Sequence, residues 1–142
     1  MLPERDRIPV EKYFSTDVLD RVRILIAHPL PIPDPPFASV MRRFGFDFPS
    51  PSLTEAITFE DVIACRAGMN ASLLFHELVH VVQYRVLGVR EFARQYISGF
   101  LDTRSYSEIP LERIAFELQS RFETDAQQFD VELQVRRSLR RI

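Results

Sequence analysis

A chain of 142 residues with a net charge of −2 fits a single domain, 1–142, that is long enough to bury its own core. The near-balanced charge gives no reason to expect a nucleic-acid partner, and no apolar run approaches the ~20 residues of a membrane span. Because Cys65 is the only cysteine, an internal disulfide and a cysteine-pair zinc site are excluded. The first residues lack the apolar segment of a signal peptide, so we expect a cytoplasmic protein, with signal-independent export as the alternative.

The first 36 residues are expected to form an N-terminal segment that ends in a proline-rich connector. Within it, 10–20 is predicted to be a short helix, and 21–27 a half-buried strand because apolar side chains alternate there. Residues 28–37 contain five prolines, which exclude a helix or a central strand. That stretch is predicted to be a stiff, extended surface connector; the alternatives are a recognition motif and a cover over an active-site cleft.

Residues 52–123 are expected to form the core that carries the functional site. Before this core, 37–46 is predicted to be a short helix and 49–52 a turn. The β-branched residues in 55–59 and 62–66 predict two strands, joined tightly by two acidic residues.

The next element, 70–87, is predicted to be a buried helix. Asn70 or Ser72 can cap its start, and Gly88 ends it. Apolar residues surround this helix almost completely, which is typical of a helix inside its domain: Leu73, Leu74, Phe75, Leu78, Val79, Val81 and Val82.

Two further helices are predicted after Gly88. The first covers about 89–101, and a polar loop follows it. Pro110 suits the first position of a long C-terminal helix over 110–139. Apolar residues recur there at alternating spacings of three and four, which draws one stripe: Leu111, Ala115, Leu118, Phe122, Ala126, Phe129 and Leu133.

Three polar residues stand inside the buried helix 70–87. His76 and His80 are four residues apart, so both imidazoles lie on one helix face and can bind one ion. With Glu77 they form the H-E-x-x-H pattern, in which two histidines bind zinc and the glutamate acts as general base. Polar groups buried without partners are costly, so the placement favours a zinc site. The alternative is a pair of core histidines with Glu77 as their counter-charge.

Catalysis by zinc requires three protein ligands and an open fourth position. No histidine follows His80, so the third ligand is expected to be a carboxylate from a later helix. Glu112 is preferred because it lies in the first turn of the last predicted helix, where Ala115 leaves room for the motif helix. The other candidates are Glu117, Glu108 and Asp102.

Three other residues are candidates for supporting roles. Gln83 lies on the same helix face as the histidines, and its amide can hold a ligand or the next helix; a core amide bonded to backbone is the alternative. Tyr106 precedes Glu112, and its hydroxyl can stabilise the oxyanion of a tetrahedral intermediate; simple packing is the alternative. His28, which stands beside prolines, is interpreted as a surface or structural residue.

The sequence "HELVHVVQY" followed by "YSEIPLERIAFE" resembles the gluzincin metallopeptidases, in which a glutamate on a later helix is the third zinc ligand. More narrowly, it resembles small bacterial metallopeptidase domains with a motif helix like H-E-L-x-H-V-x-Q. These include the minigluzincins and domains of extracellular contractile injection system proteins. His76, Glu77, His80 and Gln83 match the motif helix, and Glu112 begins the matching E-x-x-A pattern.

The resemblance covers about residues 52–123, and "EAITFEDVIACR" is similar to the β-hairpin before the motif helix in such domains. It implies an α+β, zincin-like fold, in which a small β-sheet packs on the buried motif helix, with a long C-terminal helix. It also implies a Zn²⁺-dependent metallopeptidase that acts on a peptide or protein substrate.

In the implied mechanism, Glu77 is the general base on zinc-bound water and passes the proton to the leaving amine. If the strand 62–66 borders the cleft, it is expected to pair with an extended substrate. One alternative is a non-catalytic interaction domain stabilised by zinc. Another is a latent enzyme whose cleft is blocked by the N-terminal or proline-rich segment.

Overall fold

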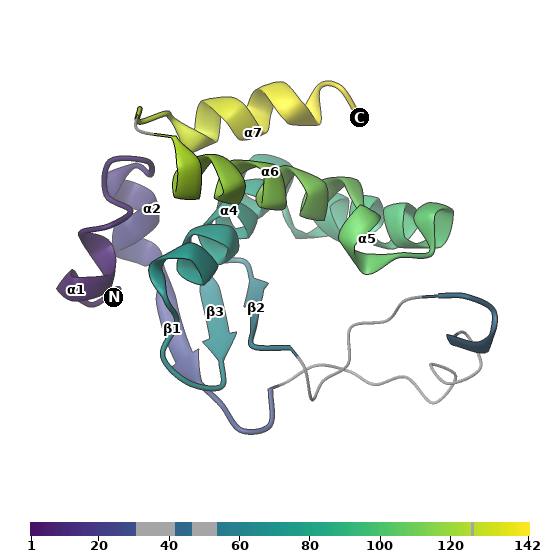
Figure 1. The fold of residues 1–142 in the computed structure, drawn as a ribbon, viewed down its shortest axis with the longest axis horizontal. Coiled ribbons are helices and arrows are strands. Elements are labelled where there is room, and N and C mark those ends of the chain that lie inside the picture. Colours follow the sequence, from purple (N-terminus) through teal and green to yellow (C-terminus); the bar gives the residue numbers. More distant parts are fainter. Residues whose placement is uncertain (31–41, 47–53, 126) are drawn as a thin grey trace.

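The computed structural model of the chain describes residues 1–30, 42–46, 54–125 and 127–142. The described elements, in chain order, are α1 (Glu4–Arg7), α2 (Thr16–Arg21), β1 (Arg23–Ile26), β2 (Ala56–Phe59), β3 (Val62–Cys65), α4 (Ala71–Leu87), α5 (Val89–Thr103), η1 (Tyr106–Glu108), α6 (Pro110–Thr124) and α7 (Val131–Leu139). The fold is α+β, as predicted: in Figure 1 the helices α4, α6 and α7 lie above a small sheet. Most of the proline-rich connector, half of the helix expected over 37–46 and the turn expected over 49–52 lie outside the described residues.

The sheet has three strands in the order β1-β3-β2. β2 and β3 form an antiparallel hairpin in which Phe59 pairs with Val62, so the two predicted strands are confirmed to within one residue. β1 pairs with β3 in parallel. The expectation that strand 62–66 borders a cleft and pairs with substrate is wrong, because β3 is the central strand and its backbone groups bond to a neighbour on each side. β2 is the edge strand beside α4.

The predicted strand 21–27 is shorter in the structure, and its alternation holds only at its start. Val22 is fully buried and Ile24 is half-buried, but Ile26 is 57% exposed. Leu25, which was expected to face outward, is 50% exposed. The end of β1 therefore extends past the apolar core.

Helix α4 is the central element of the molecule. The Asn70 side chain accepts a hydrogen bond from the backbone N–H of Leu73 at 2.8 Å, which caps the helix start. Every residue from Leu74 to Gln83 is buried. Gly88 ends the helix with φ = 77°, a conformation that glycine adopts without strain. The predicted buried helix is thus confirmed, with its cap at Asn70.

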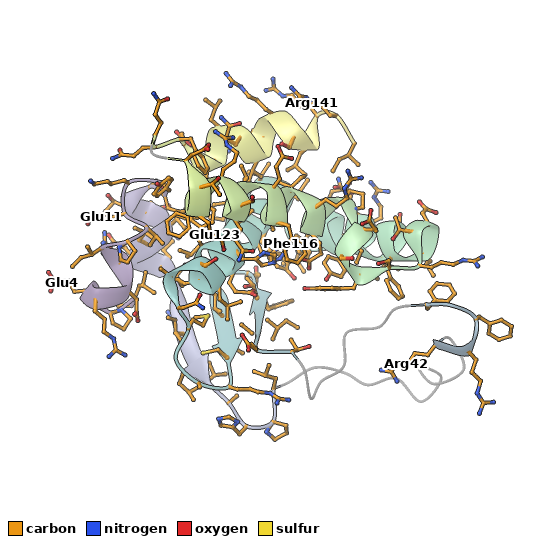
Figure 2. All side chains as sticks on the ribbon, viewed as in Figure 1. Glu4, Glu11, Arg42, Phe116, Glu123 and Arg141 are labelled. Carbon is orange, nitrogen blue, oxygen red and sulfur yellow. The ribbon has the colours of Figure 1, made fainter. Side chains whose placement is uncertain are left out.

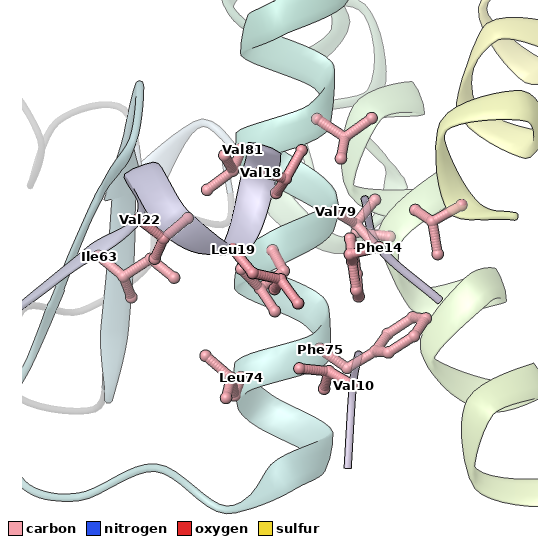
Figure 3. Packing of buried hydrophobic residues seen from close by; sticks show 14 of the residues in the cluster. Val10, Phe14, Val18, Leu19, Val22, Ile63, Leu74, Phe75, Val79 and Val81 are labelled. Carbon is pink, nitrogen blue, oxygen red and sulfur yellow. The ribbon is translucent and has the colours of Figure 1, made fainter. Parts of the chain in front are cut away.

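The N-terminal segment contributes to the main core. Val10, Phe14 and Leu19 lie close to Phe75 on one face of α4 (Figure 3). Tyr13 meets Phe75 edge-on at a centroid distance of 5.6 Å. Within the helix expected over 10–20, only the second half is helical: the Ser15 hydroxyl caps α2, which begins at Thr16, and residues 10–13 form turns. These packed residues anchor the start of the chain against α4.

The single long helix expected over 110–139 is wrong, because the structure contains two helices there. α6 ends before Asp125, and α7 begins after Asp130, whose side chain accepts a hydrogen bond from the backbone N–H of Leu133 at 3.0 Å. Phe129 lies between the two helices and still packs edge-on against Tyr13 at 5.1 Å. The predicted stripe does not continue into α7, because its last residue, Leu133, is 45% exposed and α7 buries Val131 and Val135 instead.

Candidate metal centre

His76, His80 and Glu112 meet in one buried cluster. His76 and His80 project from the buried helix α4, and Glu112 projects from the first turn of α6. The His76 Nε2 and His80 Nε2 atoms are 3.1 Å apart. The Glu112 Oε2 atom lies 3.2 Å from His76 Nε2 and 3.3 Å from His80 Nε2. Two nitrogen atoms and one oxygen atom therefore form a nearly equilateral triangle.

This triangle has the size of a metal site. Zinc binds imidazole nitrogen and carboxylate oxygen at about 2.0–2.2 Å, and tetrahedral geometry then separates the ligand atoms by about 3.3–3.5 Å. The three distances in the cluster, 3.1–3.3 Å, are close to that separation. Two imidazoles and a carboxylate are also a donor set that Zn²⁺ accepts. The cluster can therefore hold a metal ion.

The hydrogen bonds behind the histidines aim their Nε2 atoms at the centre of the cluster. The Gln83 amide nitrogen donates to the Leu111 carbonyl at 2.9 Å, so the amide oxygen faces His80 Nδ1 at 2.8 Å. An amide oxygen only accepts, so His80 Nδ1 carries a hydrogen and, in a neutral imidazole, the lone pair is on Nε2. On the other side, the Gln119 amide oxygen lies 3.0 Å from His76 Nδ1.

Glu112 is held from the opposite side by a tyrosine. The Tyr96 hydroxyl of α5 donates to Glu112 Oε1 at 2.7 Å, which leaves Oε2 directed at the two histidines. Glu112 is 2% exposed. The other candidates for the third ligand are all exposed and outside the cluster: Glu117, Glu108 and Asp102. Among the candidates for a third ligand, the structure brings only Glu112 to the histidines.

Glu77 is buried next to the cluster and is fixed to the sheet. It is 5% exposed, and its Oε2 atom accepts a hydrogen bond from the Thr58 hydroxyl of β2 at 2.6 Å. Thr58 is itself buried, so this is a bond between two polar groups in the interior. Glu77 is not one of the three residues whose donor atoms form the triangle.

Tyr106, the residue expected to stabilise an oxyanion, lies at the border of this centre. It is half-buried in η1, and its hydroxyl interacts with Glu112 and Tyr96. Burial and the nearby negative charges of Glu112 and Glu77 raise the pKa of Tyr106 well above its usual value. The phenol therefore remains protonated at neutral pH and can act as a hydrogen-bond donor. His28 is exposed and is not a member of the cluster.

The charges in the cluster are strongly coupled. Burial lowers the pKa of the His80 imidazole, but the carboxylates of Glu112 and Glu77, together with the bond to Gln83, raise it to about 9. Burial raises the pKa of Glu112, but His80, His76 and Tyr96 hold it well below its usual value. Without a metal ion, a proton on His80 is thus the positive charge that balances the buried carboxylate. A divalent cation supplies the same balance and displaces that proton.

Tyr96, Gln119 and Thr58 belong to this centre and were not predicted from the sequence. Gln119 lies seven residues after Glu112, which is about two helical turns and the same face, so spacing offered a signal. Thr58 is a polar residue on the inward side of β2, like the buried Ala56. Tyr96 has no motif around it, and only the packing of α5 against α6 brings it to Glu112.

Comparison of this chain with protein-family models, with curated proteins and with solved structures found no match. Within the described part of the chain, no helix has the length and apolar character needed to cross a bilayer. The geometry of the centre is therefore the basis from which a function can be inferred.

Proposed function

We propose that this chain is a zinc-dependent metallopeptidase of the gluzincin type, with His76, His80 and Glu112 as the metal ligands. The observation that carries the proposal is the triangle of three donor atoms, spaced 3.1–3.3 Å apart, with a second buried acid, Glu77, beside it. The sequence resemblance supports the same reading, because it covers these residues and the hairpin that carries Thr58.

The chemistry of the proposal divides between the ion and the chain. Bound zinc would act as a Lewis acid on a peptide carbonyl and make water a better nucleophile. Glu77 would take a proton from the attacking water and deliver it to the leaving amine. Thr58 keeps the Glu77 carboxylate oriented through its hydroxyl. The Tyr106 hydroxyl would donate to the developing oxyanion.

The test compares Glu77→Gln with the wild-type protein, using an unfolded protein and a mixed peptide library as substrates. A general base typically contributes about 10²- to 10⁴-fold to rate, so peptide cleavage is expected to fall by that factor while bound zinc is retained. Glu117→Gln is the matched control, because Glu117 is an exposed acid on α6. Undiminished cleavage by the zinc-loaded Glu77→Gln protein would overturn the mechanism.

A second candidate function is a non-catalytic interaction domain stabilised by zinc. The observation that favours it is the burial of the ligand side chains, since His76, His80 and Glu112 are each at most 6% exposed. Zinc-dependent stability together with an absence of cleavage on the same substrates would support this function.

Whether the enzyme is latent, with its cleft blocked by the N-terminal or proline-rich segment, has to be tested by substitution and not by truncation. Removing the first 36 residues also removes Val10, Phe14 and Leu19 from the main core, so the shortened chain is expected to unfold. Residues 31–37, the larger part of the proline-rich connector, lie outside the described residues. Internal glycine–serine replacement of those residues keeps the packed N-terminus, and a gain in cleavage would indicate latency.

A further inference from the structure

A chain of hydrogen bonds joins His76 to the surface of the molecule. The Gln119 amide oxygen lies 3.0 Å from His76 Nδ1, and its amide nitrogen is 2.8 Å from the Ser72 hydroxyl oxygen. The Ser72 hydroxyl in turn bonds to Glu123 Oε1. Glu123 is exposed on α6 and is labelled in Figure 2. Four side chains from α4 and α6 therefore form one continuous series.

The direction of each bond in this series follows from chemistry. An ionised carboxylate only accepts, so the Ser72 hydroxyl donates its single hydrogen to Glu123. The Ser72 oxygen is then an acceptor, and only the NH₂ group of Gln119 can donate to it. The Gln119 oxygen is thereby turned towards His76, whose Nδ1 atom has to donate. In a neutral imidazole this places the lone pair of His76 on Nε2, facing Glu112.

We propose that Gln119 is a positioning residue of the metal centre, which selects the metal-binding tautomer and ring orientation of His76 through the Glu123–Ser72–Gln119 series. The inference rests on the proposed metal centre but not on peptidase activity. Gln119 does not touch the ion; it acts on a ligand. It has for His76 the role that Gln83 has for His80, although the two amides are fixed differently. The Gln83 amide nitrogen donates to the Leu111 carbonyl, whereas the Gln119 amide nitrogen donates to the Ser72 hydroxyl at 2.8 Å and to Glu123 at 3.4 Å.

The neutral amide has a further consequence for the site. A ligating histidine commonly donates its other N–H to a carboxylate, a backbone carbonyl or water, and such partners set the basicity of the ligand. Here both partners are amides. The one carboxylate in the series, Glu123, does not contact His76; it accepts from the Ser72 hydroxyl and, at 3.4 Å, from the Gln119 amide nitrogen. The charge of a bound cation is then balanced mainly by Glu112 and Glu77. The neutral amides next to the histidines offset less of that charge than carboxylate partners would.

The first test reads the tautomer directly by ¹⁵N NMR of the imidazole nitrogens in the metal-free full-length protein. The chain has three histidines, so the spectrum is simple and is assigned with single variants. In the wild type, His76 is expected to carry its hydrogen on Nδ1 and a lone pair on Nε2. In Gln119→Leu, this preference is expected to be lost. A hydrogen on His76 Nε2 in the wild type, or an unchanged tautomer in Gln119→Leu, would overturn the proposal.

The second test measures the zinc dissociation constant by competition with a chromogenic chelator. Loss of an outer partner typically weakens metal binding by about 10- to 100-fold, and Gln119→Leu is expected to show such a loss. Ser72→Ala leaves the Gln119 amide nitrogen only its longer bond to Glu123, at 3.4 Å, and is expected to show a smaller loss of zinc affinity. Gln134→Leu is the matched control, because Gln134 is a half-buried glutamine on α7, which supplies no residue of the described centre.

Exchanging the amide and carboxyl groups of Gln119 and Glu123 tests whether Gln119 acts by positioning His76 or only by packing. In the double variant Gln119→Glu with Glu123→Gln, the carboxylate accepts from His76 and the new amide donates towards Ser72, so each bond keeps a partner. This variant is expected to bind zinc at least as tightly as the wild type. Weak binding by the double variant, or wild-type binding by Gln119→Leu, would contradict the role of Gln119.

The outcomes distinguish this inference from the proposed function. Failure of the wild type to bind zinc would remove both the metal centre and the role of Gln119. Zinc binding that is insensitive to Gln119 would remove only the inference. A lack of peptidase activity leaves both measurements valid, because neither uses a substrate.

Discussion

Each side chain at the centre of this protein is fixed by a second one. Gln83 and Gln119 hold the two imidazoles, Tyr96 holds Glu112, and Thr58 holds Glu77. Buried polar groups with full sets of partners orient one another, whereas a single missing partner leaves a costly unpaired group. The four supporting residues therefore help to set the orientation of the side chains that they contact.

Thr58→Val is expected to destabilise the protein, because it removes the only hydrogen-bond donor seen for the Glu77 carboxylate among the described residues and keeps the side-chain shape. A hydrogen bond to a charged group contributes about 1.5–3 kcal/mol, so the free energy of unfolding in urea should fall by that amount. Thr124→Val is the control, since that hydroxyl donates to the Ser120 carbonyl at an exposed position. Equal effects of the two substitutions would contradict the assigned role of Thr58.

The helices bring residues that are distant in sequence to one centre. The contact of α5 with the start of α6 is especially close: a Cβ atom built on Gly99 would lie 2.7 Å from Pro110 Cδ and 3.3 Å from Ile109 Cγ2. Pro110 is the first residue of α6, and Glu112 follows two residues later. Gly99 thus allows the approach that brings Tyr96 of α5 to Glu112.

Gly99→Ala is expected to destabilise the protein although alanine favours helices over glycine by about 1 kcal/mol. Overpacking against the rigid Pro110 ring should cost about 1–3 kcal/mol, and the displaced helix start should weaken zinc binding as well. Urea unfolding and zinc titration measure the two effects. Gly68→Ala is the control because no atom lies within 4 Å of its added Cβ. A stabilised Gly99→Ala protein would show that the close contact is not required.

The sequence predicted those elements whose signals are local. Helix α4 was predictable because its apolar residues, its Asn70 cap and the terminal Gly88 are contiguous in sequence. The meeting of the histidines with an acid was also predictable, since no third histidine follows and Glu112 lies at a helix start. The break between α6 and α7 was missed because Phe129 keeps its place in the apolar stripe while lying outside both helices.

The supporting residues were harder to predict, because tertiary packing brings them to the centre. Tyr96 reaches Glu112 only through the contact of α5 with α6, and Thr58 reaches Glu77 only because β2 lies beside α4. Gln83, by contrast, is one turn from His80 on the same helix, and its supporting position was anticipated. Residues that act across elements leave little trace in a single sequence.

The fold buries two carboxyl groups, those of Glu77 and Glu112, in the interior of the molecule. Glu77 is buried on α4 and Glu112 on α6, which packs against α4, and the proton on His80 balances their charge in the absence of metal. Unpaired buried charge is strongly unfavourable, so the stability of the metal-free fold depends on the protonation of this cluster.

The pH dependence of the metal-free protein follows from the two pKa shifts. The pKa of His80 is raised from 6.5 to about 9, so its contribution is fully present below about pH 6.5 and is lost as the pH rises towards 9. The pKa of Glu112 is lowered from 4.5, so its contribution is present above about pH 4.5 and is lost on acidification. The free energy of unfolding, measured with urea in the presence of a chelator, should therefore be greatest between about pH 4.5 and pH 6.5.

Glu112→Gln is the control for this dependence, because it removes the main counter-charge of His80. The decline between pH 6.5 and 9 should be much smaller in that variant. Added zinc should stabilise the wild type more strongly as the pH rises through the same range, because it replaces the His80 proton. A metal-free wild type whose stability is constant or rises from pH 6.5 to 9 would contradict the described coupling.

The most direct test of the metal centre is the metal content of the tag-free wild-type protein, measured beside His80→Ala and Glu112→Ala after equilibration with zinc and removal of the excess. The account predicts a single tightly bound zinc ion per chain in the wild type and a large loss in both variants, because each removes one of three ligands. A wild type that binds no zinc, or a Glu112→Ala protein that binds it as tightly as the wild type, would contradict the proposed centre.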